Sequence, residues 1–225
     1  MTSQSPATDR QLTITGASLL GAPLLLAGYG TVRLFDGHHG PGPGWTIGHV
    51  LLLLGVLGFA PVLLHLRGLA AELGRVRRLA ANAAAAAGLL GVCAVLGQTA
   101  VDLYVGAVSA DRAAMDVRYD HFQSHPGVTP LLYTVLPLFF YLGLIALTAV
   151  LALGRPRLTG LRVPVLVLVA TVVMAAGLDL MPVGGLLLAA AFGPLGLALL
   201  TEARTPRTPR AHLTGDTPAR FRPTA

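Results

Sequence analysis

The chain has 225 residues, of which 54% are hydrophobic and only 12% are charged, and its mean hydropathy is +0.69. Soluble domains carry roughly 25% charged residues, so this composition argues against a soluble domain and is typical of a membrane protein. The formal net charge is +6, and every basic residue other than histidine is an arginine. The absence of lysine excludes a Schiff base of the kind that holds retinal.

Six apolar stretches follow one another along the chain, each close to the ~20 residues that cross a bilayer as a helix. Lipid offers no partner for backbone N–H and C=O groups, so each stretch is expected to be α-helical. The expected fold is all-α, a polytopic bundle of six transmembrane helices. The stretches are 13–33, 47–66, 81–107, 131–153, 163–181 and 184–200. A tight turn is expected between the last two, at residues 182–184.

Arginine is concentrated in three of the segments that lie outside these stretches. The connections after the second and fourth stretches and the C-terminal tail are rich in arginine, whereas the connections after the first and third carry at least as many acids. The positive-inside rule therefore predicts that both termini are cytoplasmic, in a multi-pass protein of the cell membrane. Residues 1–12 form the cytoplasmic N-terminus and residues 13–200 the transmembrane domain. Residues 201–225, rich in Arg, Pro and Thr, are expected to form a disordered cytoplasmic tail.

Ionisable side chains occur near the outer ends of several stretches. Asp102, Asp179 and Arg33 lie on the three helices that run outward, and His49 enters the second stretch at the same level. Gln98 lies one turn before Asp102 on the same helix face. An ionised side chain costs at least ~2.5–3.5 kcal/mol at the bilayer centre, and pairing removes much of that cost. We expect an outward-facing polar pocket, with pairing or snorkelling that fixes helix packing as the alternative.

The outer segment "SADRAAMDVRYDHFQSHPG", residues 109–127, predicts a short helix that begins after Ser109 or Asp111 and stops before Pro126. Arg112 is four residues from Asp116, so the two can form an ion pair on one helix face.

Two histidines of the same segment have the spacing with which imidazoles can share one metal ion on a helix. The second precedes a proline, which disfavours helical geometry there, and the pattern lacks the glutamate of zinc proteases. A solvated interfacial helix is therefore the preferred interpretation, and metal binding the weaker one. The candidate ligands are His121, His125, Asp116 and Asp120.

Aromatic residues add candidates for the wall of the pocket. Tyr133 and Tyr141 flank Pro137, which is expected to kink the fourth stretch and to free a carbonyl. Tyr104 follows Asp102 by two residues. The histidines are not paired as axial haem ligands, and no phosphate loop, nucleophile elbow or dinucleotide fingerprint is present. We expect no cofactor and no nucleic-acid partner.

The stretches "GPGWTIGHVLLLLG" (42–55) and "HPGVTPLLYTVLPLFFYLG" (125–143) resemble small six-span membrane proteins of actinobacterial type, most of them without an assigned activity. In size and in its isolated intramembrane acids the chain is also similar to membrane-integral terpene cyclases. Those enzymes use a carboxylic acid to protonate an alkene or an epoxide. No motif of theirs matches specific residues here, so no catalytic residue is transferred.

Three hypotheses follow. The first is a membrane-embedded enzyme for general-acid chemistry on a lipophilic small molecule, such as isoprenoid cyclisation, with Asp102 or Asp179 as the acid and His49 or Gln98 tuning it. Arg33 and the tyrosines would line the substrate pocket. The second is a proton- or cation-coupled transporter, expected as a homodimer because six spans are few. The third is a structural membrane subunit. Continuous apolar sequence below the two aspartates favours a one-sided pocket over a path through the membrane.

Overall fold

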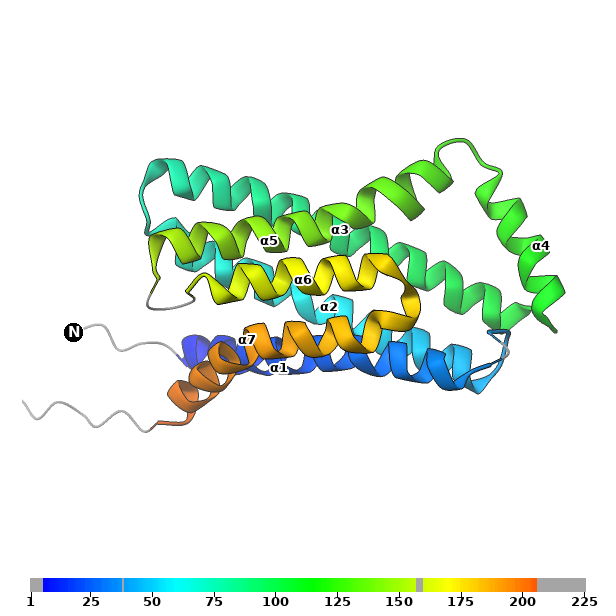
Figure 1. The fold of residues 1–225 in the computed structure, drawn as a ribbon, viewed down its shortest axis with the longest axis horizontal. Coiled ribbons are helices and arrows are strands. Elements are labelled where there is room, and N and C mark those ends of the chain that lie inside the picture. The colour runs from blue at the N-terminus through cyan, green and yellow to red at the C-terminus, as the bar shows by residue number, and fades with distance from the viewer. Residues whose placement is uncertain (1–5, 38, 157–159, 206–225) are drawn as a thin grey trace, which may run out of the picture.

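Helices account for most of the computed structural model, which describes residues 6–37, 39–156 and 160–205. No strand occurs in these ranges. Figure 1 shows the long helices lying side by side, with α1 beginning and α7 ending at the same end of the bundle. The helical segments are α1 (Pro6–Phe35), α2 (Pro43–Ala71), α3 (Arg75–Val108), α4 (Arg112–Gln123), η1 (Val128–Val135), α5 (Leu136–Gly154), α6 (Arg162–Ala176), η2 (Leu178–Leu180) and α7 (Met181–Arg204).

Five of the described helices are long and apolar enough to cross a membrane, as expected for an integral membrane protein of several passes. Two of these continuous helices include the short segments that precede them, η1 before α5 and η2 before α7. The five are Asp9–Phe35, Pro43–Ala71, Arg75–Val108, Val128–Gly154 and Leu178–Arg204. The expected fifth stretch, 163–181, is shorter than predicted, because α6 ends at Ala176 after 15 residues.

The connection between α6 and α7 also differs from the expected turn at residues 182–184. Gly177 has extended backbone angles and ends α6, and Leu178–Leu180 form one 3₁₀ turn. Pro182 lies in the first turn of α7, where a missing N–H is tolerated and a fixed φ favours the helix. The turn therefore precedes the proline instead of containing it.

The chain ends differ from their expected bounds as well. α1 begins at Pro6, inside the expected N-terminal segment 1–12, because polar residues extend the helix beyond the apolar stretch. α7 ends at Arg204. Residues 1–5 and 206–225, which include most of the expected disordered tail, lie outside the described residues.

Pro137 marks a change of helix type in the fourth stretch. Val128–Val135 form a π-helix, and the α-helix begins at Leu136. The N–H of Leu136 donates to the carbonyl of Leu131, five residues back, and Pro137 has no N–H with which to continue the ladder. In Figure 1 the segment before α5 leans away from α3 at the end of the bundle that carries α4.

Aromatic rings and glycines hold the centre of the bundle together. The rings of Phe140 and Phe192 lie edge-on to Phe59, with centroids 5.0 and 6.4 Å away. A Cβ on Gly143 would lie 2.5 Å from the carbonyl oxygen of Ala84, and one on Gly185 would lie 2.6 Å from the amide of Ala27. Such close backbone approach through small residues is how helices associate in lipid.

Candidate functional site

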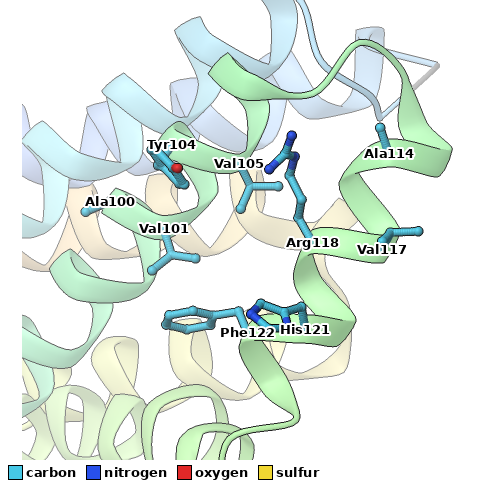
Figure 2. A pocket seen from close by; sticks show the side chains of 9 residues that line it. All are labelled: Ala100, Val101, Tyr104, Val105, Ala114, Val117, Arg118, His121 and Phe122. Carbon is cyan, nitrogen blue, oxygen red and sulfur yellow. The ribbon is translucent and has the colours of Figure 1, made fainter.

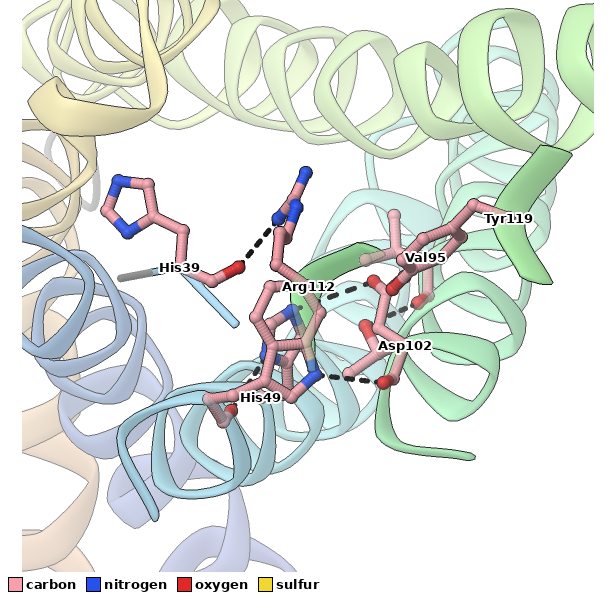
Figure 3. Close-up of polar contacts among 8 residues, drawn as sticks. His39, His49, Val95, Asp102, Arg112 and Tyr119 are labelled. Atoms are coloured by element: carbon pink, nitrogen blue, oxygen red, sulfur yellow. Dashed lines mark hydrogen bonds and ion pairs between the residues drawn. The ribbon is translucent and has the colours of Figure 1, made fainter. Parts of the chain in front are cut away.

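Asp102 lies on α3, where its carboxyl group contacts side chains from two other helices (Figure 3). The hydroxyl of Tyr119 on α4 donates to Oδ1 at 2.8 Å. Nε2 of His49 on α2 lies 3.7 Å from Oδ2, and the side chains of His49 and Asp102 are 7% and 14% exposed. Asp102 therefore joins α2, α3 and α4 at one end of the bundle.

His49 is held by its own helix and by flanking rings. Its Nδ1 lies 2.8 Å from the main-chain oxygen of Trp45, and because a carbonyl only accepts, this nitrogen carries a hydrogen. A second proton, on Nε2, would make His49 a cation facing Asp102. The imidazole packs between Trp45 and Tyr29, with ring centroids 4.1 and 5.5 Å away.

Trp45 reinforces the same junction from the main chain. Its indole Nε1 donates to the carbonyl oxygen of Asp102 at 2.9 Å, and a Cβ on Gly106 would lie 2.5 Å from the indole Cδ1. The absence of a side chain at Gly106 thus lets the indole lie against α3.

Tyr119 remains a hydrogen-bond donor at ordinary pH. Burial and the neighbouring Asp102 carboxylate both raise the pKa of Tyr119 above its usual value, because the phenolate would be poorly solvated and repelled. The neutral phenol is therefore the form that contacts Asp102.

Arg33 and Asp179 form a separate pair. Nε of Arg33 lies 3.8 Å from Oδ1 of Asp179, whose side chain is 73% exposed. Asp179 belongs to the 3₁₀ turn η2, which packs against α1. The expected group of Asp102, Asp179, Arg33 and His49 is thus arranged as two pairs on different helices, and the residue beside Asp102 is His49, not Arg33.

A small cavity lies between the end of α1 and the start of α2. Tyr29, Arg33 and His49 line it together with residues of the connection from α1 to α2, and its volume is about 10 Å³. That is close to the smallest space that holds one water molecule. It is too small for an organic substrate.

The other expected pocket residues are dispersed. Gln98 is half-buried and makes no hydrogen bond to Asp102 in the described part of the chain. The hydroxyl of Tyr133 is buried without a partner among the described residues. Tyr141 packs its ring on Phe140 at 4.9 Å, and Tyr104 is 64% exposed.

α4 has the form expected from the sequence. Asp111 caps α4 by accepting a hydrogen bond from the N–H of Ala114 at 2.8 Å, and Arg112 pairs with Asp116 at 3.0 Å.

The four candidate metal ligands on and just after α4 do not converge. The rings of His121 and His125 lie edge to face, 5.5 Å apart, and Nδ1 of His125 is 3.1 Å from the carbonyl oxygen of His121. Asp116 is paired with arginine, and Asp120 is exposed. Within the described ranges, no three His, Cys, Asp or Glu side chains are grouped to hold a metal ion.

A large cavity separates α3 from α4, shown in Figure 2. Its volume is about 830 Å³, within the range of ligand-binding pockets. The α3 side consists of Ala100, Val101, Tyr104 and Val105, and the α4 side of Ala114, Val117, Arg118, His121 and Phe122. Tyr104 and His121 were among the residues expected from the sequence. The other lining residues were not, because small and apolar side chains and a single arginine carry no signal until α3 and α4 are placed together.

Asp102 is not part of the cavity wall, although Val101 and Val105 beside it on α3 are. Its contact with Tyr119 also bridges α3 and α4, so the carboxyl group helps to hold the two walls of the cavity together from a neighbouring position on α3.

No known protein family, curated protein or solved structure matches the chain.

Tyr119→Phe removes the donor to Asp102 and should loosen α4. Hydrogen bonds to charged groups contribute ~1.5–3 kcal/mol, so amide hydrogens of residues 112–123 should exchange ~10-fold faster or more. Hydrogen exchange with mass spectrometry checks this, with Tyr104→Phe as the control, since Tyr104 is exposed and makes no side-chain hydrogen bond among the described residues. Equal exchange in the two variants would contradict the role of Tyr119.

Proposed function

We propose that this protein is a six-span integral membrane protein that binds a lipophilic molecule between α3 and α4. The sixth crossing in this proposal is α6. Figure 1 supports it, because α5 and α7 run in the same direction and α6 returns between them. At 1.5 Å per residue, its 15 residues cover about 22 Å, which is shorter than the ~30 Å hydrocarbon core. Local thinning of the bilayer accommodates a short span.

The orientation rests on charge. The ends of α2, α5 and α7 lie at the end of the bundle where α1 begins, and most arginines of the described chain are there. They are Arg10, Arg67, Arg75, Arg77, Arg78, Arg155, Arg162 and Arg204. The positive-inside rule makes this end cytoplasmic. The Asp102 junction and α4 then face outward, in the cell membrane.

The cavity between α3 and α4 is the observation that carries the binding proposal. It is large, its lining is mainly apolar, and it lies where α4 would rest at the membrane surface. A lipophilic molecule from the bilayer would replace lipid contacts with protein contacts there and place its polar end near water.

The contacts of Asp102 favour binding over the acid-catalysed cyclisation that the sequence suggested. A general acid must reach its substrate, and both oxygens of Asp102 face Tyr119 and His49. The buried core between this level and the arginine-rich end is mainly apolar in the described chain, which also gives transport little support. A homodimer stays a prediction that none of these contacts requires.

Topology can be tested by labelling single cysteines with a membrane-impermeant thiol reagent outside intact cells. In a Cys93→Ala background, Ser124→Cys at the end of α4 should react and Thr205→Cys at the end of α7 should not. Both positions are exposed in the structure, so permeabilised cells should label both. Reaction at Thr205→Cys in intact cells would overturn the orientation.

Filling the cavity tests the binding site. Val101→Trp should reduce the dioleoyl phosphatidylcholine retained by detergent-purified protein in native mass spectrometry by ~10-fold or more, since the added ring occupies the apolar space. Val172→Trp is the matched control, because Val172 is 60% exposed on α6 and away from the cavity. Equal retention in wild type and both variants would contradict the proposed function.

A further inference from the structure

Arg118 differs from the other arginine of α4. Arg112 pairs with Asp116 at 3.0 Å and donates to the carbonyl oxygen of His39 at 2.6 Å. Arg118 has neither a carboxylate partner nor a side-chain hydrogen bond within the described part of the chain, although Asp116 and Asp120 lie on the same helix. Among the described residues, Arg112 thus has protein partners for its charge and Arg118 has none.

The unpaired guanidinium lies in the wall of the cavity, on the side facing α3 (Figure 2). Val101 and Val105 face it from α3, and Phe122 lies one turn farther along α4. A guanidinium beside apolar walls gains most from an anion that it can bind through two N–H groups. His121, three residues along the same helix, brings a second polar group into the cavity.

We propose that the α3–α4 cavity binds a phospholipid with a net negative headgroup, whose phosphate contacts Arg118 and whose acyl chain lies along Val101, Val105 and Phe122. This inference rests on the proposed function and specifies its ligand. The polar and apolar parts of the cavity match the two parts of such a lipid. Arginines near the membrane surface attract anionic lipid through the same charge complementarity.

A free inorganic anion fits the cavity less well than a lipid does. It would contact Arg118 and leave the apolar walls uncovered, and an exposed single cation binds small anions weakly because water screens the attraction. The apolar chain supplies the affinity and the headgroup supplies the selectivity. Both parts are therefore required.

The experiment compares dioleoyl phosphatidylglycerol with dioleoyl phosphatidylcholine, which have the same chains, in native mass spectrometry of the detergent-purified full chain. Wild type should retain phosphatidylglycerol ~10-fold more strongly. Arg118→Gln should lose that preference and keep its retention of phosphatidylcholine, and Arg118→Lys should recover most of it. Arg112→Gln is the matched control on the same helix and should keep the preference.

The outcomes separate the two proposals. If Val101→Trp removes retention of both lipids while Arg118→Gln leaves the preference unchanged, the cavity binds lipid and the assignment to Arg118 is wrong. If Val101→Trp changes neither lipid, both proposals fail. Displacement of phosphatidylglycerol by millimolar inorganic phosphate would also overturn the lipid assignment, because a free anion would then suffice.

Discussion

A carboxyl group in an apolar helix bundle needs polar partners, because lipid and hydrophobic side chains provide none. Asp102 finds them in Tyr119 at 2.8 Å and in His49 at 3.7 Å. Tyr119 lies on α4, a short polar helix that follows α3 and precedes the η1–α5 helix. Its hydrogen bond to Asp102 therefore brings α4 back over the end of α3. The space enclosed between α3 and α4 is the cavity to which we assign a ligand.

In the proposed function, one part of this arrangement holds the helices together and a neighbouring part contacts the ligand. His49, Trp45 and Tyr119 surround Asp102 on one face of α3. The neighbouring cavity between α3 and α4 presents apolar side chains with Arg118 and His121. An intramembrane acid is a reasonable first candidate for catalysis, and its contacts with Tyr119 and His49 support the proposal that it positions α4 instead.

Much of the helical framework could be predicted from apolar length alone, and α4 from its cap and its proline. The cap at Asp111 could be predicted because a side-chain acceptor at that position has a local partner, the N–H of Ala114. The end of α6 could not be predicted, since "AAGLDLMP" contains no residue that forbids one more turn before Pro182. Its position depends on how η2 packs against α1 and α7.

The partners of the polar residues were harder to predict, because similar depth in a membrane does not determine which helix faces meet. Arg33 was a natural partner for Asp102 on charge, yet α1 packs against α7 and η2, and Arg33 therefore meets Asp179. Tyr119 lies outside the apolar stretches, and nothing local to it indicates a buried partner 17 residues earlier. The cavity could not be predicted either, because the sequence does not show which faces of α3 and α4 lie opposite each other.

In the proposed function, Asp102 shapes the lipid cavity through Tyr119 and does not itself act on a ligand. The most direct measurement is a double-mutant cycle on phosphatidylglycerol retention with Asp102→Ala, Tyr119→Phe and the double variant. We expect each single variant to retain less phosphatidylglycerol than wild type. The double variant should retain as much as the weaker of the two single variants, which corresponds to a coupling energy of ~1–3 kcal/mol. Unchanged retention in Asp102→Ala, or strictly additive effects, would contradict the account.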